Sequence, residues 1–127
     1  MTVTPIDLLT TAIHFRHDGD VRAEERTFAP ARDGWQLMTF HAETDAAVHA
    51  DHWEIHCEAD EVVACLTGGL RLYLRPEQPG HEEDEVKLEA GAAVIVPRGR
   101  WHRIELDAAS DIMAITLPRG TSLEKRS

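Results

Sequence analysis

Three observations in the sequence predict an all-β fold, a sandwich or a barrel. From about residue 13 onward, short and mostly apolar runs recur at intervals of about ten residues. Glycine, proline or aspartate separates most of these runs. No segment carries a helical pattern long enough to cover a sheet. The strands must therefore bury their apolar faces against one another.

The expected elements follow one another along the chain. Thr4, Pro5 and Asp7 are typical of a short helix start, with Thr4 as the cap and Pro5 at the first helical position. No later segment repeats that signal, so a short N-terminal helix is the most helix that we expect. Strands are then expected at residues 14–16, 22–28, 35–41, 47–56, 61–67, 70–75, 85–88, 92–96, 101–106 and 112–117.

Three segments have a composition that predicts their structure: two turns and the C-terminal end. Thr67-Gly68-Gly69 accepts a positive φ, which favours a hairpin between residues 61–66 and 70–74. Residues 76–85 hold two prolines, a glycine and five acidic residues. We interpret them as a solvated hairpin tip rather than a cation site. The charged residues 123–127 are expected to form a loose tail.

Length and charge exclude several classes of protein. The 127 residues suffice for one ordinary domain, and no linker or repeat divides them. Thirteen basic against 23 acidic residues give a net charge of −10, which repels phosphate backbones, so no nucleic acid partner is expected. Residues 1–7 lack a signal-peptide pattern, and no apolar run is long enough to span a membrane. We therefore expect a cytoplasmic protein with no membrane partner, in which Cys57 and Cys65 are free thiols.

One segment gathers ionisable side chains. The chain has eight histidines, and His49, His52 and His56 lie close together. Because side chains alternate between the two faces of a strand, His52, Glu54 and His56 are expected to share a face. If that face lines a barrel interior, burying these groups is costly unless something compensates them. A divalent cation compensates them directly.

The spacing in this segment resembles the first conserved motif of the cupin superfamily. That motif usually reads His-x-His, three or four residues, Glu, six residues and Gly. Here the pattern is Glu54-x-His56, four residues, Glu61, six residues and Gly68. The first histidine of the family pattern is thus a glutamate. Val48 stands where the family has a glycine, six positions before it.

A second pattern further along the chain resembles the second cupin motif. It consists of Gly91, five residues, Pro97-x-Gly99, two residues and His102. Leu106 stands where the family pattern closes with asparagine. Pro97 and Gly99 are expected to form the tight turn that directs His102 inward.

The resemblance implies a fold and an assembly. The fold is the cupin-type double-stranded β-helix, a jelly-roll barrel, in one domain over residues 1–127 with the motifs at about 54–68 and 91–106. The sequence is similar to that of a group of small bacterial single-domain cupins in three short stretches: Trp-Glu-x-His, Asp-Glu-Val-Val and Val-Pro-Arg-Gly-x-Trp-His-Arg. Such proteins commonly exchange N-terminal strands, so we expect a homodimer in which residues 14–28 cover an exposed sheet edge.

The resemblance also implies one divalent metal ion bound by Glu54, His56, Glu61 and His102. Two imidazole nitrogens and two carboxylate oxygens suit Fe, Mn, Ni or Zn, and the lack of thiolate ligands disfavours a closed structural zinc site. Alternatives remain open at this stage: His52 in place of Glu54, competition from Asp60 for the role of Glu61, and His102 as a packing residue.

Other side chains have two readings each. Cys65 shares the parity of Glu61, so it either lines the cavity or is an inert buried thiol. We expect Trp35, Trp53 and Trp101 to be core or interface residues rather than to stack on a substrate, because tryptophan more often has that role. Three arginines surround the second motif and either hold an anionic substrate or balance surface charge: Arg98, Arg100 and Arg103.

Two functions from different classes fit these residues. The first is a metal-dependent enzyme that acts on a small oxygen-containing organic molecule bound to the metal inside the barrel, by isomerase, lyase or oxygenase chemistry. The alternative is a non-catalytic module that binds a metal or a metabolite. No catalytic residue beyond the expected ligands can be assigned from the sequence. A third, structural reading leaves the four residues without a ligand.

Overall fold

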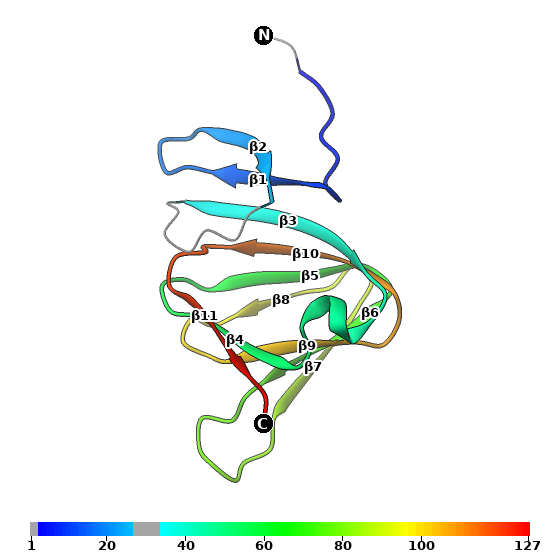
Figure 1. Cartoon of the computed structure of the whole chain (residues 1–127), viewed down its shortest axis with the longest axis vertical. Helices are drawn as coiled ribbons and strands as arrows, with labels where there is room; N and C mark the ends of the chain where they lie inside the picture. The colour runs from blue at the N-terminus through cyan, green and yellow to red at the C-terminus, as the bar shows by residue number, and fades with distance from the viewer. Residues whose placement is uncertain (1–2, 27–33) are drawn as a thin grey trace.

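The computed structural model describes residues 3–26 and 34–127, which form two antiparallel sheets (Figure 1). The six-stranded sheet has the order β2-β1-β3-β10-β5-β8, and the five-stranded sheet has the order β11-β4-β9-β6-β7. The strands are β1 Thr11–Phe15, β2 Val21–Glu25, β3 Trp35–Ala42, β4 His52–His56, β5 Glu61–Thr67, β6 Gly69–Leu74, β7 Asp84–Glu89, β8 Ala93–Val96, β9 His102–Leu106, β10 Ser110–Thr116 and β11 Thr121–Lys125. The expected all-β jelly roll is confirmed.

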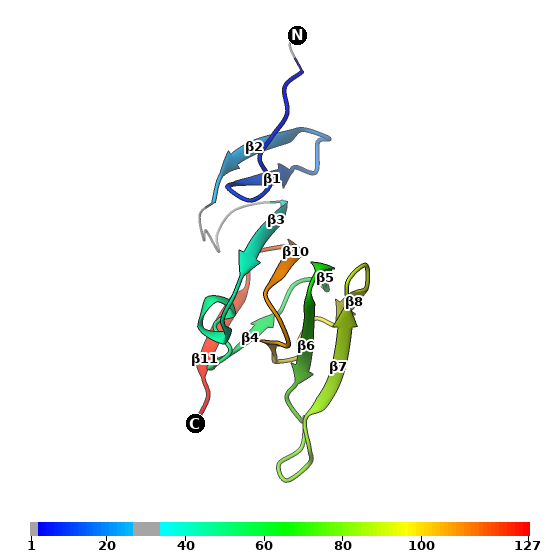
Figure 2. The same ribbon diagram turned by 90° about the vertical axis from the view of Figure 1, so that its right-hand side faces the viewer.

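The core lies where the two sheets face each other. Alternate residues of β5 and β6 point inward, so Val63, Leu70 and Leu72 are almost fully buried. Ile112 from β10 packs into the same cluster. Burying each large aliphatic side chain stabilises the fold by about 1.5–3 kcal/mol. The β1–β2 hairpin lies outside this core, at the end of the molecule that carries the N-terminus in both views (Figures 1 and 2).

The expected hairpin around Gly68 is wrong. β5 pairs with β10 and β8 in one sheet, whereas β6 pairs with β7 and β9 in the other. The turn therefore carries the chain between sheets. Gly68 has φ 85°, and a Cβ there would lie 2.2 Å from the carbonyl oxygen of Ala109. Only glycine fits this turn between the sheets. The prediction of a glycine-dependent turn is therefore confirmed, but the prediction that β5 and β6 pair with each other is wrong.

Two further expectations are corrected. No helix starts at Thr4: the side chain of Asp7 accepts a hydrogen bond from the Leu9 amide (2.9 Å), and this local turn replaces the first helical turn. The expected strand 47–56 is a strand only from His52. Before it lies the short 3-10 helix η1, Asp45–Val48, which ends at His49 in the left-handed conformation with φ 52°.

The C-terminal segment is a strand and not a loose tail. β11 pairs with β4 in a register that places Thr121 opposite His56 and Leu123 opposite Glu54. The amide of Arg126 also donates to the Asp51 carbonyl (2.8 Å). The charged side chains stay exposed while the backbone of β11 pairs at the edge of the sheet. The charged composition predicted a loose tail because it describes the side chains and not the backbone pairing.

Other expected elements agree with the structure within a few residues. β6 and β7 form a hairpin whose tip holds the exposed acidic segment, as expected. The expected strand 22–28 is found as β2, and its last two residues lie outside the described part of the chain. Cys57 and Cys65 are free thiols. Among the described residues, no helix is long and apolar enough to cross a membrane.

Candidate metal centre

A cavity of about 470 Å³ opens between the two sheets. This volume lies within the usual range of small-molecule sites, about 300–1,000 Å³. One wall is apolar, with Met38 and Phe40 from β3 and Ile112 from β10. The polar part of the lining includes all four expected ligands: Glu54, His56, Glu61 and His102.

Strand pairing explains why residues far apart in sequence meet. Glu54 and His56 stand two apart on β4 and therefore share a face. His102 begins β9 and lies directly opposite Glu54 in the β4–β9 pair. Glu61 begins β5 in the other sheet. Three donors thus come from one sheet and one from the sheet that faces it.

The turn of the second motif positions His102. The amide of Gly99, a residue with φ 78°, donates to the His56 carbonyl (2.8 Å) and ties this turn to β4. The amide of Arg98 donates to the carboxylate of Asp60 (2.9 Å). Both bonds hold the start of β9 against the strand ends that carry the other three donors.

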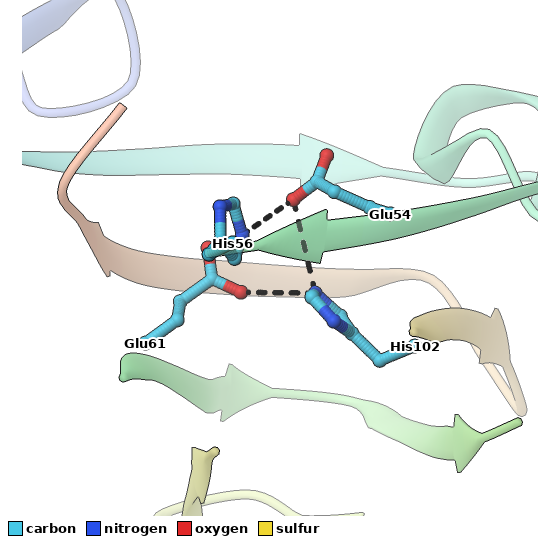
Figure 3. A group of neighbouring side chains, drawn as sticks. All are labelled: Glu54, His56, Glu61 and His102. Carbon is cyan, nitrogen blue, oxygen red and sulfur yellow. Dashed lines mark ion pairs between the residues drawn. The ribbon is translucent and has the colours of Figure 1, made fainter. Parts of the chain in front are cut away.

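The four head groups point toward one another (Figure 3). One ligand atom from each residue lies within 4.8 Å of all the others. His56 Nε2 lies 2.8 Å from Glu54 Oε1 and 3.1 Å from Glu61 Oε2, and His102 Nε2 lies 3.1 Å from Glu61 Oε1. Metal–ligand bonds of about 2.0–2.2 Å separate opposite ligands of one ion by up to about 4.4 Å. The three separations of 2.8–3.1 Å lie within this limit, so these donors are close enough to share an ion.

Burial differs within the group. His56, Glu61 and His102 are 3–5% exposed, whereas the Glu54 side chain is 37% exposed. His56 Nε2 is buried and makes no hydrogen bond of acceptable geometry, although two carboxylates lie close to it. A buried ring nitrogen without a hydrogen bond is costly. A cation among the four head groups would give this atom its missing partner, so the residues fit a divalent metal.

The three buried donors also contact groups outside the four-residue set. Thr121 Oγ1 lies 2.8 Å from His56 Nδ1, and Thr116 Oγ1 donates to Glu61 Oε2 (2.6 Å). His102 Nδ1 lies 3.3 Å from the Arg100 carbonyl oxygen, which only a protonated Nδ1 can use. When Nδ1 carries the proton, Nε2 is left free to bind a metal. Both histidines therefore direct Nε2 to the common centre.

The metal-free group carries a buried ion pair. Burial alone would lower the pKa of His56, but its contacts with Glu54 and Glu61 outweigh burial and raise that pKa to about 10. Burial alone would raise the pKa of Glu61, yet its contacts with His102 and His56 lower that pKa to about 2. Without a metal, a proton on His56 thus compensates the buried carboxylate.

The geometry favours one side of each alternative left open by the sequence. His52 lines the cavity, but its Nδ1 lies 2.9 Å from Asp51 Oδ1, and it is not part of the four-residue group. Asp60 is exposed and bound to Arg98, while Glu61 faces inward. Cys65 is fully buried in the apolar core, and burial raises the pKa of its thiol.

The arginines of the second motif are held by nearby acids. Arg98 contacts Asp60, and Arg100 contacts Glu77 and Asp84. Arg103 is buried, contacts two glutamates and lies over the rings of Trp53 and Tyr73. Their positive charges are thus compensated within the protein.

Sequence reasoning missed the two threonines behind the donor group. Thr116 stands at the end of an expected strand, and Thr121 lies just before the expected tail. Threonine is common on strands, so neither position carries a signal of its own. Only the pairing of β11 with β4 and of β10 with β5 reveals the role of these residues.

Comparisons with solved structures identify proteins of the same fold. No protein-family model and no curated protein matches the chain. The structure is similar to that of a cupin-2 domain containing protein from Shewanella frigidimarina, at 25% identity and a TM-score of 0.50 over 72% of this chain and 76% of that chain. It is also similar to Fe(II)-HppE with (S)-1-HPP, at 16% identity and a TM-score of 0.52 over 65% and 42% of the two chains.

A third solved structure has the same fold. It is hydroxypropylphosphonic acid epoxidase from S. wedmorenis in complex with fosfomycin, at 16% identity and a TM-score of 0.52 over 65% of this chain and 43% of that chain. Our chain spans less than half of this epoxidase, and at that identity the likeness shows the fold alone. Together with the expected jelly roll and the two motif spacings, the likeness to the cupin-2 protein leads to one conclusion: this chain is a small member of the cupin superfamily.

Proposed function

We propose that the protein is a metal-dependent enzyme that acts on a small oxygen-containing organic molecule inside the cavity, by isomerase, lyase or oxygenase chemistry. The supporting observation is the buried Nε2 of His56, which lies between two carboxylates without a hydrogen bond. Two imidazoles and two carboxylates, with three of the four residues buried, suit a divalent cation, which would take the place of the proton on His56. Fe, Mn, Ni and Zn all suit this donor set.

The chain's own residues have three roles in this proposal. Glu54, His56, Glu61 and His102 would hold the metal, and Thr116 and Thr121 would fix two of these side chains. The apolar wall would exclude bulk water from the reacting molecule. A bound divalent ion would polarise a carbonyl or enolate oxygen, or activate water or dioxygen.

Elemental analysis tests the proposal. Protein purified without chelators is expected to carry about one divalent ion per chain, or to take one up from Fe, Mn, Ni or Zn. His56→Ala and His102→Ala are expected to lose this ion, while His81→Ala, in the exposed acidic loop, is expected to keep it. Wild-type protein that binds none of the four metals would sink the proposal.

One observation favours the alternative of a non-catalytic binding module. Among the described residues that line the cavity, Glu54 and Glu61 are the acidic ones, and both are committed to the donor group. No cavity carboxylate therefore stands apart as a general base. Incubation of the metal-loaded protein with candidate ketones, enols and sugars separates the two functions. Product formation supports the enzyme, whereas tight binding without product supports the module.

A further inference from the structure

Two arginines are among the described residues that line the cavity, and they differ in what surrounds them. Arg103 contacts Glu105 (2.9 Å) and Glu83 (3.2 Å), so its charge is compensated. Arg26 has no carboxylate within ion-pair distance in residues 3–26 and 34–127. Arg26 is thus the cavity arginine whose charge the described protein leaves uncompensated.

The protein holds Arg26 in place through backbone groups. Its Nη2 donates to the carbonyl oxygen of Leu8 (2.6 Å) and to that of Thr39. Thr39 lies on β3, between Met38 and Phe40, which line the cavity. These bonds fix the side chain at the cavity wall without neutralising it, because a backbone carbonyl carries only a partial charge.

One polar atom of Arg26 has no partner. Its Nε is buried and makes no hydrogen bond within the described part of the chain. An arginine presents its donors in a planar fork that matches the two oxygens of an oxyanion. An oxyanion in the cavity would compensate the charge of this guanidinium. In a protein of net charge −10, a partly buried and uncompensated cation is unusual enough to require a reason.

We propose that Arg26 is the anion-binding residue of the cavity, so that the substrate carries an oxyanion group, such as a carboxylate, in addition to the oxygen that reaches the donor group of Glu54, His56, Glu61 and His102. This inference rests on the proposed function, because Arg26 would bind one end of the substrate while the metal holds the other. The apolar part of the same cavity lining, with Met38, Phe40 and Ile112, suits a hydrocarbon body.

Matched pairs of small acids test this assignment. Succinate, glutarate and adipate each carry one more carboxylate than butyrate, pentanoate and hexanoate of the same chain length. Isothermal titration calorimetry on the zinc-loaded protein gives the affinity for each member of a pair. We expect wild type to bind at least one dicarboxylate about tenfold or more tightly than its partner, the usual effect of a hydrogen-bonded charge. Three dicarboxylate lengths are needed because the number of carbons that would span Arg26 and the metal is unknown.

Two variants with the same change of net charge make the test specific. Arg26→Gln is expected to abolish the preference for the dicarboxylate and to change affinity for the monocarboxylate less than about twofold. Arg22→Gln removes an exposed arginine of β2 that pairs with Asp20, so it is expected to change neither affinity. Circular dichroism and the bound zinc content report whether each variant is folded and loaded.

The outcomes separate this inference from the proposed function. A preference that Arg26→Gln removes and Arg22→Gln keeps supports the assignment. Equal affinities of wild type for both members of every pair overturn it, even if Arg26→Gln does not fold. The same titrations on metal-free protein give a second arm. Failure to bind Fe, Mn, Ni and Zn alike sinks the proposed function, whereas dicarboxylate binding that depends on Arg26 in the metal-free protein keeps the anion site.

Discussion

Two regions of this protein gather acidic residues, each with at least one histidine, and the two regions differ in convergence and burial. The donor group in the cavity brings four ligand atoms within 4.8 Å, and three of its residues are buried. The acidic loop, residues 76–85, comprises the projecting tip of the β6–β7 hairpin and the first two residues of β7 (Figures 1 and 2). There, the side chains of Glu77 and Asp84 are 72% and 77% exposed.

Solvent access explains this difference. Water and the guanidinium of Arg100 satisfy carboxylates of the acidic loop, so they need no metal ion. Inside the cavity, Glu61 is almost fully buried and relies on His56, His102 and Thr116 for its contacts. Residue type alone therefore does not mark a candidate metal site, because the side chains must also converge and be buried.

The largest effect is expected for Glu61→Gln. The amide keeps the shape of the side chain but removes its negative charge from the centre of the group. Losing a contact behind a ligand already costs about 10–100-fold in metal affinity, so losing this ligand is expected to cost more than about 100-fold. Competition with a chelator of known affinity measures the change. Unaltered affinity would remove Glu61 from the site.

Metal affinity is expected to rise with pH. The metal-free pKa of His56 is raised to about 10, so at neutral pH a proton must leave before Nε2 binds the metal. Glu61, whose pKa is lowered to about 2, stays ionised over this range and adds no slope. Chelator competition at about pH 6.5, 7.5 and 8.5 is expected to give about a tenfold gain per pH unit. A flat profile would show that His56 loses no proton on binding.

Thr121→Val is expected to have a smaller effect. Valine keeps the shape but cannot form a hydrogen bond with His56 Nδ1, so the imidazole is no longer fixed in one orientation. We expect a loss of about tenfold in metal affinity with a stoichiometry that is still one ion per chain. Thr121→Ser, which keeps the hydroxyl, is the matched control and should bind as wild type does. Equal losses in both variants would point to packing and not to the hydroxyl.

Substitutions in the acidic loop are expected to have the smallest effect. Glu82→Gln removes one negative charge, as Glu61→Gln does, but from an exposed position. The metal affinity of the cavity is expected to change by less than about twofold, because solvent screens charges at that distance. The same chelator competition measures it. A second bound ion in wild type that Glu82→Gln removes would contradict the contrast between the two regions.

Much of the fold follows from local pattern. Alternating apolar runs separated by turn residues place most of the strands, because a strand must alternate its faces wherever one face is buried. The pattern does not say which strands pair. Gly68 carries the signal of a tight turn, but whether that turn joins neighbours in one sheet or crosses between sheets depends on contacts with Ala109 and Ser110, about forty residues away.

The donor group was predictable as a list and not as a geometry. The spacing of Glu54, His56, Glu61 and His102 resembles two known motifs, so these positions could be named from the sequence. The partners behind them could not be named, since Thr121 reaches His56 only through the pairing of β11 with β4. Arg26 was missed for the same reason, because its carbonyl partners at Leu8 and Thr39 belong to other segments.

By itself, the sequence determined the class of fold, the four candidate ligands and the net charge, because periodicity, spacing and composition are properties of the chain alone. Only the tertiary structure decided which carboxylates are buried, which buried nitrogens lack a hydrogen bond and which arginines line the cavity. Those outcomes depend on strand pairing across long stretches of chain. They are set by contacts between residues whose separation in sequence carries no information about their distance in space.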